Sequence, residues 1–308
     1  MLLRPLLIAA LACFALPLHA ADRYVAITID DLPYQRGNSL AEIQALTDRL
    51  VEQVRTQGAP VAIFLNEKKL HDGGERELKA RTALIEQWLD AGAELGNHTY
   101  SHAEINTLPF DDYAQDIVRG EEISKVLLKK RGKTLKYFRH PYLHTGKDPE
   151  TRAALRSFLR QHQYIVAPVT IDNDEWIYGA AYDVAATQND ESMMRRIGAD
   201  YLTYMEQAFE FSEQLARSLF GRDIKQTLLI HANALNAEYY DELVAMMKRR
   251  GYAFVSLSEA LEDEAYRTED TYIGPKGLSW LFRWGVGQEL DTSKSPEIPT
   301  YVRELSGT

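Results

Sequence analysis

Residues 23–66, RYVAITIDDLPYQRGNSLAEIQALTDRLVEQVRTQGAPVAIFLN, give the clearest indication of the fold. The first part, RYVAITID, is a short apolar run bounded by a turn signal, which is typical of a buried strand. Ser39 and Glu42 have the spacing of a capping box ahead of an amphipathic helix that ends at Gly58. The apolar run PVAIFLN then predicts a second strand. This strand–helix–strand order predicts two parallel strands joined by a helical crossover.

The same alternation continues almost to the end of the chain. Five further apolar segments predict strands, in the stretches AELGNH, LKYFRHPY, YIVAPVTID, QTLLIHAN and YAFVSL. Helices are predicted between them at residues 75–91, 111–131, 149–163 and 237–250. Parallel strands that alternate with helices form either an open sheet or a closed barrel. We favour an α/β fold in which the seven strands form a barrel.

The first 20 residues, MLLRPLLIAALACFALPLHA, have the pattern of a signal peptide that is cleaved after Ala20. The apolar run is too short and too interrupted by proline to predict a helix that spans a bilayer. Export to the periplasm or the medium is therefore expected. Cys13, the only cysteine, lies within this segment, so a lipid-anchored form that begins at Cys13 is the alternative.

The mature chain is expected to hold one main domain over residues 21–263. Residues 180–226 form an insertion with helical periodicity between residues 191 and 220. Residues 264–308 lose the alternation and are treated as a C-terminal extension without an assigned role. The net charge of −10 and the lack of a basic patch argue against a nucleic-acid partner.

Acidic, basic and aromatic residues gather at the carboxyl ends of five predicted strands. They are Asp30 and Asp31, His98, Arg139 with Tyr142, residues 172–176, and His231. In barrels of alternating strands and helices, active sites are built at that edge. Each group alone has a plainer interpretation, such as a turn, a solvated pair or a core histidine. As a set, they predict one active site.

Two details bear on the chemistry of this set. Adjacent aspartates on a strand face opposite sides, so Asp30 and Asp31 reach one site only if the strand ends there. His98 and His102, in HTYSH, have a four-residue spacing that would place two imidazoles on one side of a helical turn. Two imidazoles and one carboxylate suit Zn²⁺ or a similar divalent ion, with positions left open for water and substrate.

These segments resemble the five ordered motifs of the polysaccharide deacetylase family, also known as the NodB-homology domain or carbohydrate esterase family four. TIDDLP is similar to TFDDGP, HTYSH to H-[ST]-x-x-H, RHPY to R-x-P-Y, DNDEW to D-x-x-D-W, and LIH to L-x-H. Two positions depart from the pattern. Leu32 stands where the family has glycine, and Glu175 stands where it has aspartate before the tryptophan.

The resemblance implies a distorted seven-stranded (β/α) barrel whose residues 21–263 are a catalytic domain. It implies a metal, most simply Zn²⁺, held by Asp31, His98 and His102. It implies that Asp30 is the general base and that Arg139 holds this base in place. It implies that His231 is the general acid, tuned by Glu175 or, as the alternative, by Asp174. The backbone N–H of Tyr142 would stabilise the oxyanion, and Trp176 and Leu229 would line the pocket for the acetyl methyl.

The activity that the resemblance implies is metal-dependent removal of N-acetyl groups from an exported glycan, with O-acetyl esters as a variant. An amide resists hydrolysis because attack places charge on its oxygen and expels a poor leaving group. A metal, a base, an acid and an oxyanion donor meet these demands. The alternatives are a metal-independent amidase of the same fold, which acts on a small amide, and a non-catalytic carbohydrate-binding protein.

Overall fold

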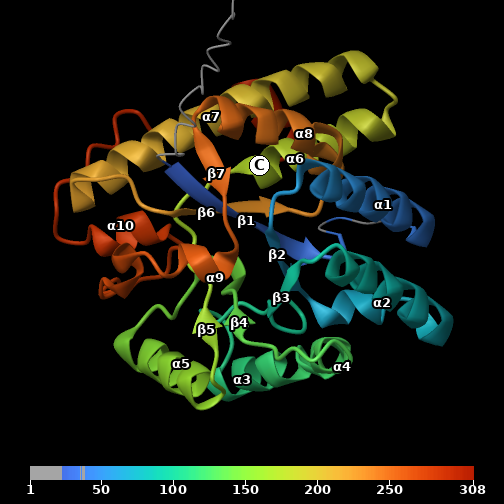
Figure 1. Ribbon diagram of the computed structural model, residues 1–308, viewed down its shortest axis with the longest axis horizontal. Helices are drawn as coiled ribbons and strands as arrows, with labels where there is room; N and C mark the ends of the chain where they lie inside the picture. Colours follow the sequence, from blue (N-terminus) through green and yellow to red (C-terminus); the bar gives the residue numbers. More distant parts are fainter. Residues whose placement is uncertain (1–22, 35, 37–38) are drawn as a thin grey trace, which may run out of the picture.

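The computed structural model describes residues 23–34, 36 and 39–308. The predicted signal peptide, its cleavage site and Cys13 lie outside the described residues. Seven parallel strands form one sheet, and their bounds are β1 Arg23–Leu32, β2 Val61–Leu65, β3 Glu94–Asn97, β4 Tyr137–Phe138, β5 Ile165–Val166, β6 Gln226–His231 and β7 Tyr252–Phe254. The order across the sheet is β5-β4-β3-β2-β1-β6, and β7 pairs with β1 outside this path (Figure 1).

The sheet curls into a distorted and incompletely closed barrel, as predicted. β1 pairs with three strands, β2, β6 and β7, and its residues from Val25 to Leu32 are buried. Ile171, after the end of β5, forms an isolated parallel bridge with Leu228 of β6, which brings the two ends of the sheet together. The prediction that YIVAPVTID is one continuous strand is wrong, since only Ile165–Val166 pairs as a strand before the chain leaves the sheet.

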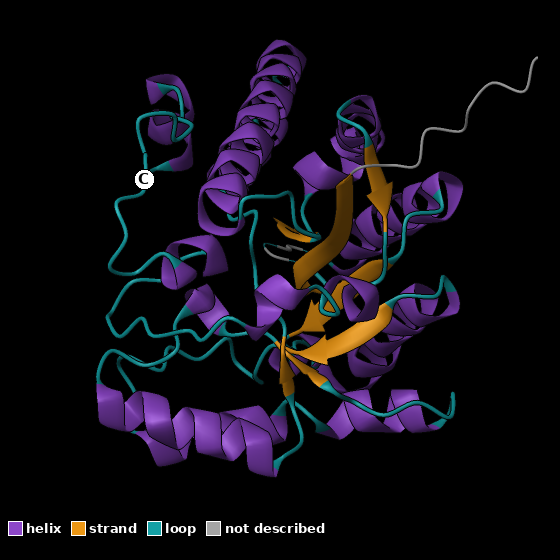
Figure 2. Ribbon diagram, turned by 60° about the vertical axis from the view of Figure 1, so that its left-hand side comes forward, coloured by secondary structure: helices purple, strands orange, loops and turns teal. Residues whose placement is uncertain are grey.

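Helices surround the sheet (Figure 2). Their bounds are α1 Leu40–Gln57, α2 Gly74–Asp90, α3 Phe110–Arg119, α4 Glu122–Lys129, α5 Pro149–Gln161, α6 Glu175–Thr187, α7 Glu191–Phe220, α8 Ala234–Arg249, α9 Leu257–Ala260, α10 Trp280–Trp284 and α11 Thr300–Ser306, with short 3₁₀ turns η1 Glu67–Leu70, η2 Pro141–Leu143 and η3 Glu264–Arg267. The main core joins residues of β1, β2 and β6 to the inner faces of α1, α2, α6, α7 and α8. No helix among the described residues is long and apolar enough to cross a membrane.

The helix predicted over residues 111–131 is divided into α3 and α4 at Gly120 and Glu121. Gly120 lies against the backbone of Thr99 and Tyr100, where a Cβ atom would be 2.8 Å away. The buried carboxylate of Glu67 accepts hydrogen bonds from the backbone N–H groups of α4's first residues, which gives the second helix its own start. The break therefore places the helix pair directly behind the loop that follows β3.

The segment predicted as an insertion contains most of α6 and all of α7, a helix of 30 residues. The C-terminal extension packs on the barrel through a second apolar cluster, in which Trp280, Leu281 and Trp284 contact residues of α7 and β6. Its side chains therefore form part of the same structure as the barrel. The boundary placed at residue 263 stays a prediction.

Candidate active site

A cavity of about 550 Å³ lies at the carboxyl ends of the strands. Its lining includes eight of the ten residues to which the resemblance gives a role, Asp30, Asp31, His98, His102, Tyr142, Trp176, Leu229 and His231, and also Asp174, the alternative to Glu175. Arg139 and Glu175, the other two, are fully buried and contact Asp30 and His231. The residues predicted to form one site are therefore together, although their individual roles stay predictions.

Both aspartates face this cavity because β1 is irregular at its end. The strand continues to Leu32, but its pairing with β2 shifts between Ile29 and Leu32. Asp31 has a φ of 69°, in the left-handed region that residues with a Cβ rarely adopt. The irregularity breaks the alternation of side chains that a regular strand would impose. It replaces the simple strand end that the sequence suggested.

Asp31, His98 and His102 present one ligand atom each within 4.8 Å of one another. Asp31 Oδ1 lies 3.9 Å from His98 Nε2 and 3.7 Å from His102 Nε2, with no hydrogen bond of its own. An ion about 2 Å from each ligand needs ligand atoms roughly 3–4 Å apart. Both aspartate–histidine distances lie in this range, so these residues suit a divalent cation such as Zn²⁺, in a three-ligand arrangement with open positions.

The two histidines lie on an irregular loop, so the predicted helical turn is wrong. Thr99 and His102 have φ values of 63° and 57°, which fold HTYSH back on itself and bring the rings to 4.8 Å between centroids. His98 Nδ1 is 2.9 Å from the carbonyl oxygen of Arg139 and must donate to it. His98 Nε2 is therefore left unprotonated and faces Asp31, which is the orientation that a metal ligand needs.

The protonation states of His98 and Asp31 also suit the binding of a metal. Burial holds the pKa of His98 well below its usual value, so the ring is neutral at pH 7 and can act as a ligand. Burial raises the pKa of Asp31, but the Lys69 ammonium and His102 outweigh it and hold that pKa below its usual range. Lys69 Nζ donates to the Asp31 carbonyl oxygen at 2.9 Å and lies 3.3 Å from Asp31 Oδ1.

Arg139, which the resemblance implies as the partner of the general base, lies beside Asp30. Arg139 Nη1 lies 3.5 Å from Asp30 Oδ2, and Nη2 donates to Thr28 Oγ1 at 2.7 Å. The guanidinium is fully buried and also lies 4.6 Å from the centre of the Phe64 ring. Burial raises the pKa of Asp30 to about 6, although Arg139 and His231 oppose the increase. A carboxylate in this range can take a proton near neutral pH.

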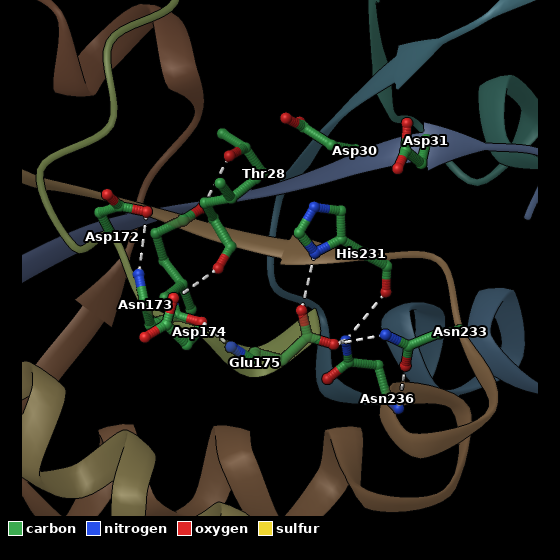
Figure 3. Close-up of polar contacts among 12 residues, drawn as sticks. Thr28, Asp30, Asp31, Asp172, Asn173, Asp174, Glu175, His231, Asn233 and Asn236 are labelled. Atoms are coloured by element: carbon green, nitrogen blue, oxygen red, sulfur yellow. Dashed lines mark hydrogen bonds and ion pairs between the residues drawn. The ribbon is translucent and has the colours of Figure 1, made fainter. Parts of the chain in front are cut away.

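His231 is paired with Glu175 on the other side of the cavity (Figure 3). Its Nδ1 donates to Glu175 Oε2 at 2.8 Å, and the second nitrogen of the ring faces the side on which Asp30 and Asp31 lie (Figure 3). Burial lowers the pKa of His231, but the hydrogen bond and the charge of Glu175 outweigh it and raise that pKa to about 9. The ring is therefore an imidazolium at neutral pH.

Glu175 itself is the first residue of α6 and is fully buried. Besides His231, its carboxylate accepts hydrogen bonds from the side-chain amides of Asn233 and Asn236. Of the two alternatives, Glu175 and Asp174, the carboxylate in contact with the histidine is that of Glu175. The extra methylene of glutamate does not prevent the contact.

Tyr142, Trp176 and Leu229 lie at the mouth and wall of the cavity. Tyr142 has a φ of 56°, and its half-exposed ring meets His102 edge to face at 4.4 Å between centroids. Leu229 is buried and Trp176 is partly buried, so both offer apolar surface to a ligand. Substrate contact by these three residues stays a prediction.

The sequence interpretation missed Lys69, His144 and Gly277, and it gave Asp172 no role of its own. Lys69 follows the second strand at the same edge of the sheet, a signal that could have been used. Burial, with the charge of Asp174 second, raises the pKa of Asp172 to about 7 at the cavity wall. His144 pairs with Glu104 at 2.7 Å, and Gly277 of the C-terminal extension lines the cavity. No pattern in the sequence pointed to the last two.

Comparison with known proteins agrees with the resemblance. Residues 19–159 match the family model described as polysaccharide deacetylase, a range that holds the first three motifs. The last two motifs lie beyond it, and the structure places Glu175 and His231 of those motifs beside the first three. The comparison with curated protein sequences finds no significant match.

Solved structures with the same fold include the following two. A mutant of a CE4 family pseudoenzyme from Bacillus anthracis, with restored enzymatic activity, is 18% identical with a TM-score of 0.51 and covers 79% of this chain and 69% of its own. A peptidoglycan N-acetylglucosamine deacetylase is 17% identical with a TM-score of 0.50, over 78% of this chain and 89% of its own. At this identity, both comparisons bear on the fold alone.

Proposed function

We propose that this member of the polysaccharide deacetylase family is a divalent-metal-dependent hydrolase that removes N-acetyl groups from an exported polysaccharide or oligosaccharide. The observation that carries the proposal is the arrangement around one cavity of three ligand atoms within 4.8 Å, a buried carboxylate on one side and a histidine–glutamate pair on the other. Sugar binding alone would need neither the ligand set nor two proton-transfer groups with opposed protonation states.

The residues of the chain divide the work as follows. When bound by Asp31, His98 and His102, a divalent cation supplies a Lewis acid that acidifies water and polarises a carbonyl. Asp30, kept in place by Arg139, accepts the proton of the attacking water. His231, kept protonated by Glu175, donates a proton to the departing nitrogen. Each proton transfer is thus assigned to a group whose pKa suits it.

The remaining residues orient the substrate. The backbone N–H of Tyr142 stabilises the oxygen that gains charge during attack. Trp176 and Leu229 form the apolar wall that accepts the acetyl methyl group. The predicted signal peptide supports an extracytoplasmic glycan as the substrate, and zinc is the metal that the ligand set favours.

An acetate-release screen tests this function. Purified mature protein would be loaded with Zn²⁺, Co²⁺ or Mn²⁺ and incubated with chitin oligomers, peptidoglycan fragments, acetylated exopolysaccharide and acetylated xylan. We expect acetate release from at least one N-acetylated glycan, abolished by a chelator and by Asp30→Asn. Release only from xylan would shift the proposal to O-acetyl esters.

Two results would refute it in favour of the alternatives. Full activity on a small amide with no metal bound would identify a metal-independent amidase. Saturable glycan binding without acetate release, under every metal, would identify a non-catalytic carbohydrate-binding protein, an outcome that the pseudoenzyme among the similar structures makes a necessary control.

A further inference from the structure

A second cavity, of about 470 Å³, lies between α5 and the C-terminal extension. One wall comes from α5, the other from residues 266–270, and Trp280 of α10 contributes to the lining. His140 is the one lining residue that it shares with the candidate active site. None of its other lining residues has a role in the proposed hydrolysis.

The walls carry an unusual concentration of arginine. Arg152, Arg156 and Arg160 recur every four residues along α5 and therefore share one helix face, and Arg267 lies on the opposite wall. Arg156, Arg160 and Arg267 are exposed, and within the described part of the chain their guanidinium groups have no ion pair or hydrogen bond. The protein as a whole carries a net charge of −10, so this local excess of positive charge is contrary to its overall balance.

The acidic residues of the cavity do not cancel this charge. Asp270 is already engaged by two arginines, with Arg152 Nη2 at 3.1 Å and Arg283 Nη2 at 2.8 Å from its Oδ2. Glu269 is the second carboxylate of the lining, and it is set against the three remaining arginines, Arg156, Arg160 and Arg267. The cavity therefore keeps a positive potential that a single-charged or double-charged anion would complement.

Two buried polar atoms at the cavity lack a partner. Arg152 is 7% exposed and fixed by Asp270, yet its Nε has no hydrogen bond. His140 is 4% exposed, and its Nδ1 is likewise unsatisfied. Buried polar atoms are seldom left unpaired in folded proteins. Arg152 and His140 therefore add fixed polar side chains to the lining, beside the exposed arginines.

The lining also contains apolar and aromatic side chains. They are Leu155 and Leu159 of α5 and Tyr266 and Trp280 of the extension. Apolar and aromatic walls with a few fixed polar groups are typical of small-molecule sites, and the volume lies within their usual range. The non-polar face of a sugar ring suits such walls, while a charged substituent would meet the arginines.

We propose that this cavity binds an anionic saccharide unit, a sugar ring that carries a carboxylate or a phosphate. Arg156, Arg160 and Arg267 close on the anionic group, and Tyr266 and Trp280 support the ring. The carboxylate source would be a uronic acid residue of a glycan, and the phosphate source would be a free phosphorylated sugar. This inference goes beyond the proposed hydrolysis, because binding here needs neither the metal nor turnover.

Isothermal titration calorimetry on the full mature chain tests the site. Wild-type protein and the triple variant Arg156→Gln, Arg160→Gln, Arg267→Gln would be titrated with a glucuronate disaccharide, glucose 6-phosphate, a neutral disaccharide and inorganic phosphate. The matched control replaces three exposed arginines elsewhere, Arg55→Gln, Arg76→Gln and Arg249→Gln. Because all six side chains are exposed, each variant is expected to keep the wild-type melting temperature within a few degrees.

We expect wild-type protein and the control to bind at least one of the anionic sugars, and the triple variant to bind it at least about tenfold more weakly. A preference for the uronate or for the phosphate identifies the source. The proposal is overturned if neither anionic sugar binds with a dissociation constant below about 10 mM. It is also overturned if the control variant loses as much affinity as the triple variant, or if inorganic phosphate or the neutral disaccharide binds as tightly as the anionic sugars. Repeating the titration in Asp30→Asn separates this result from the outcome of the acetate-release screen.

Discussion

The substitution Glu175→Gln tests how the proposed general acid is kept protonated. Glu175 Oε2 is 2.8 Å from His231 Nδ1, and the glutamine keeps the size and one hydrogen-bonding oxygen while removing the charge. The pKa of His231 would then fall from about 9 to its ordinary value of 6.5 or below, because burial is the leading influence that remains. A change of this size corresponds to about 3 kcal/mol of lost stabilisation of the imidazolium.

The loss of activity should depend steeply on pH. At about pH 8, the protonated fraction of His231 falls from roughly 0.9 to roughly 0.03, so kcat/KM should drop about thirtyfold. At about pH 6, the same substitution should lower kcat/KM by less than about twofold, because most of the His231 rings would still be protonated. The dependence of kcat/KM on pH would be measured on metal-loaded wild-type protein and on metal-loaded Glu175→Gln. The fall of kcat/KM at high pH should begin at a lower pH in the variant.

Glu175→Asp is the matched control, because it keeps the charge and introduces the residue that the family pattern has at this position. It should keep its descending limb within about one pH unit of the wild-type value. If Glu175→Gln lowers activity by the same factor at every pH while the protein stays folded, Glu175 does not act by keeping His231 protonated. That result would mean that the pair only holds the ring in place.

Three further predictions concern other parts of the site. Asp30→Asn should lower acetate release by at least about a hundredfold and leave metal content unchanged, as measured by metal analysis of the same sample. Gly277→Ala should raise KM, because the added Cβ would lie 1.8 Å from the Tyr142 carbonyl oxygen and must displace that loop; an unchanged KM would show that the loop does not contact substrate. In metal-free protein, the His231–Glu175 pair raises the pKa of the histidine from 6.5 to about 9. Its stabilising contribution is therefore complete below about pH 6.5 and is lost as the pH rises through about 9, which urea unfolding at several pH values should show as a decline absent from Glu175→Gln.

Sequence patterns were sufficient for the fold and for the convergence of the site. Alternating strands and helices require parallel strands, and parallel strands place their carboxyl ends at one edge. That single fact brings Asp30, His98, Arg139 and His231 together although up to about 200 residues separate them along the chain. The convergence did not depend on the exact length of any strand.

Local backbone geometry was harder to predict. No residue pattern in ITIDDLP predicts the left-handed conformation of Asp31, because the periodicity of a strand describes only regular segments. HTYSH has helical spacing, but the loop after β3 reaches the same result with left-handed residues at Thr99 and His102. In both cases the tertiary contacts around the site decide the conformation.

The contribution of the C-terminal extension could not be predicted for a different reason. Its residues follow no periodic pattern, so their partners are set by packing between distant segments. Trp280 meets His140, with 6.3 Å between ring centroids, and Gly277 approaches the Tyr142 carbonyl oxygen. Only the folded structure shows that residues beyond 263 help to shape both cavities.

Calorimetric titration of chelator-treated protein with Zn²⁺ shows whether a divalent cation binds among Asp31, His98 and His102. We expect about one zinc ion per chain, bound at least about tenfold more weakly after Asp31→Ala or His102→Ala and equally well after Asp30→Asn. If wild-type protein binds no divalent metal, or if Asp31→Ala binds it equally well, these residues do not form the metal site.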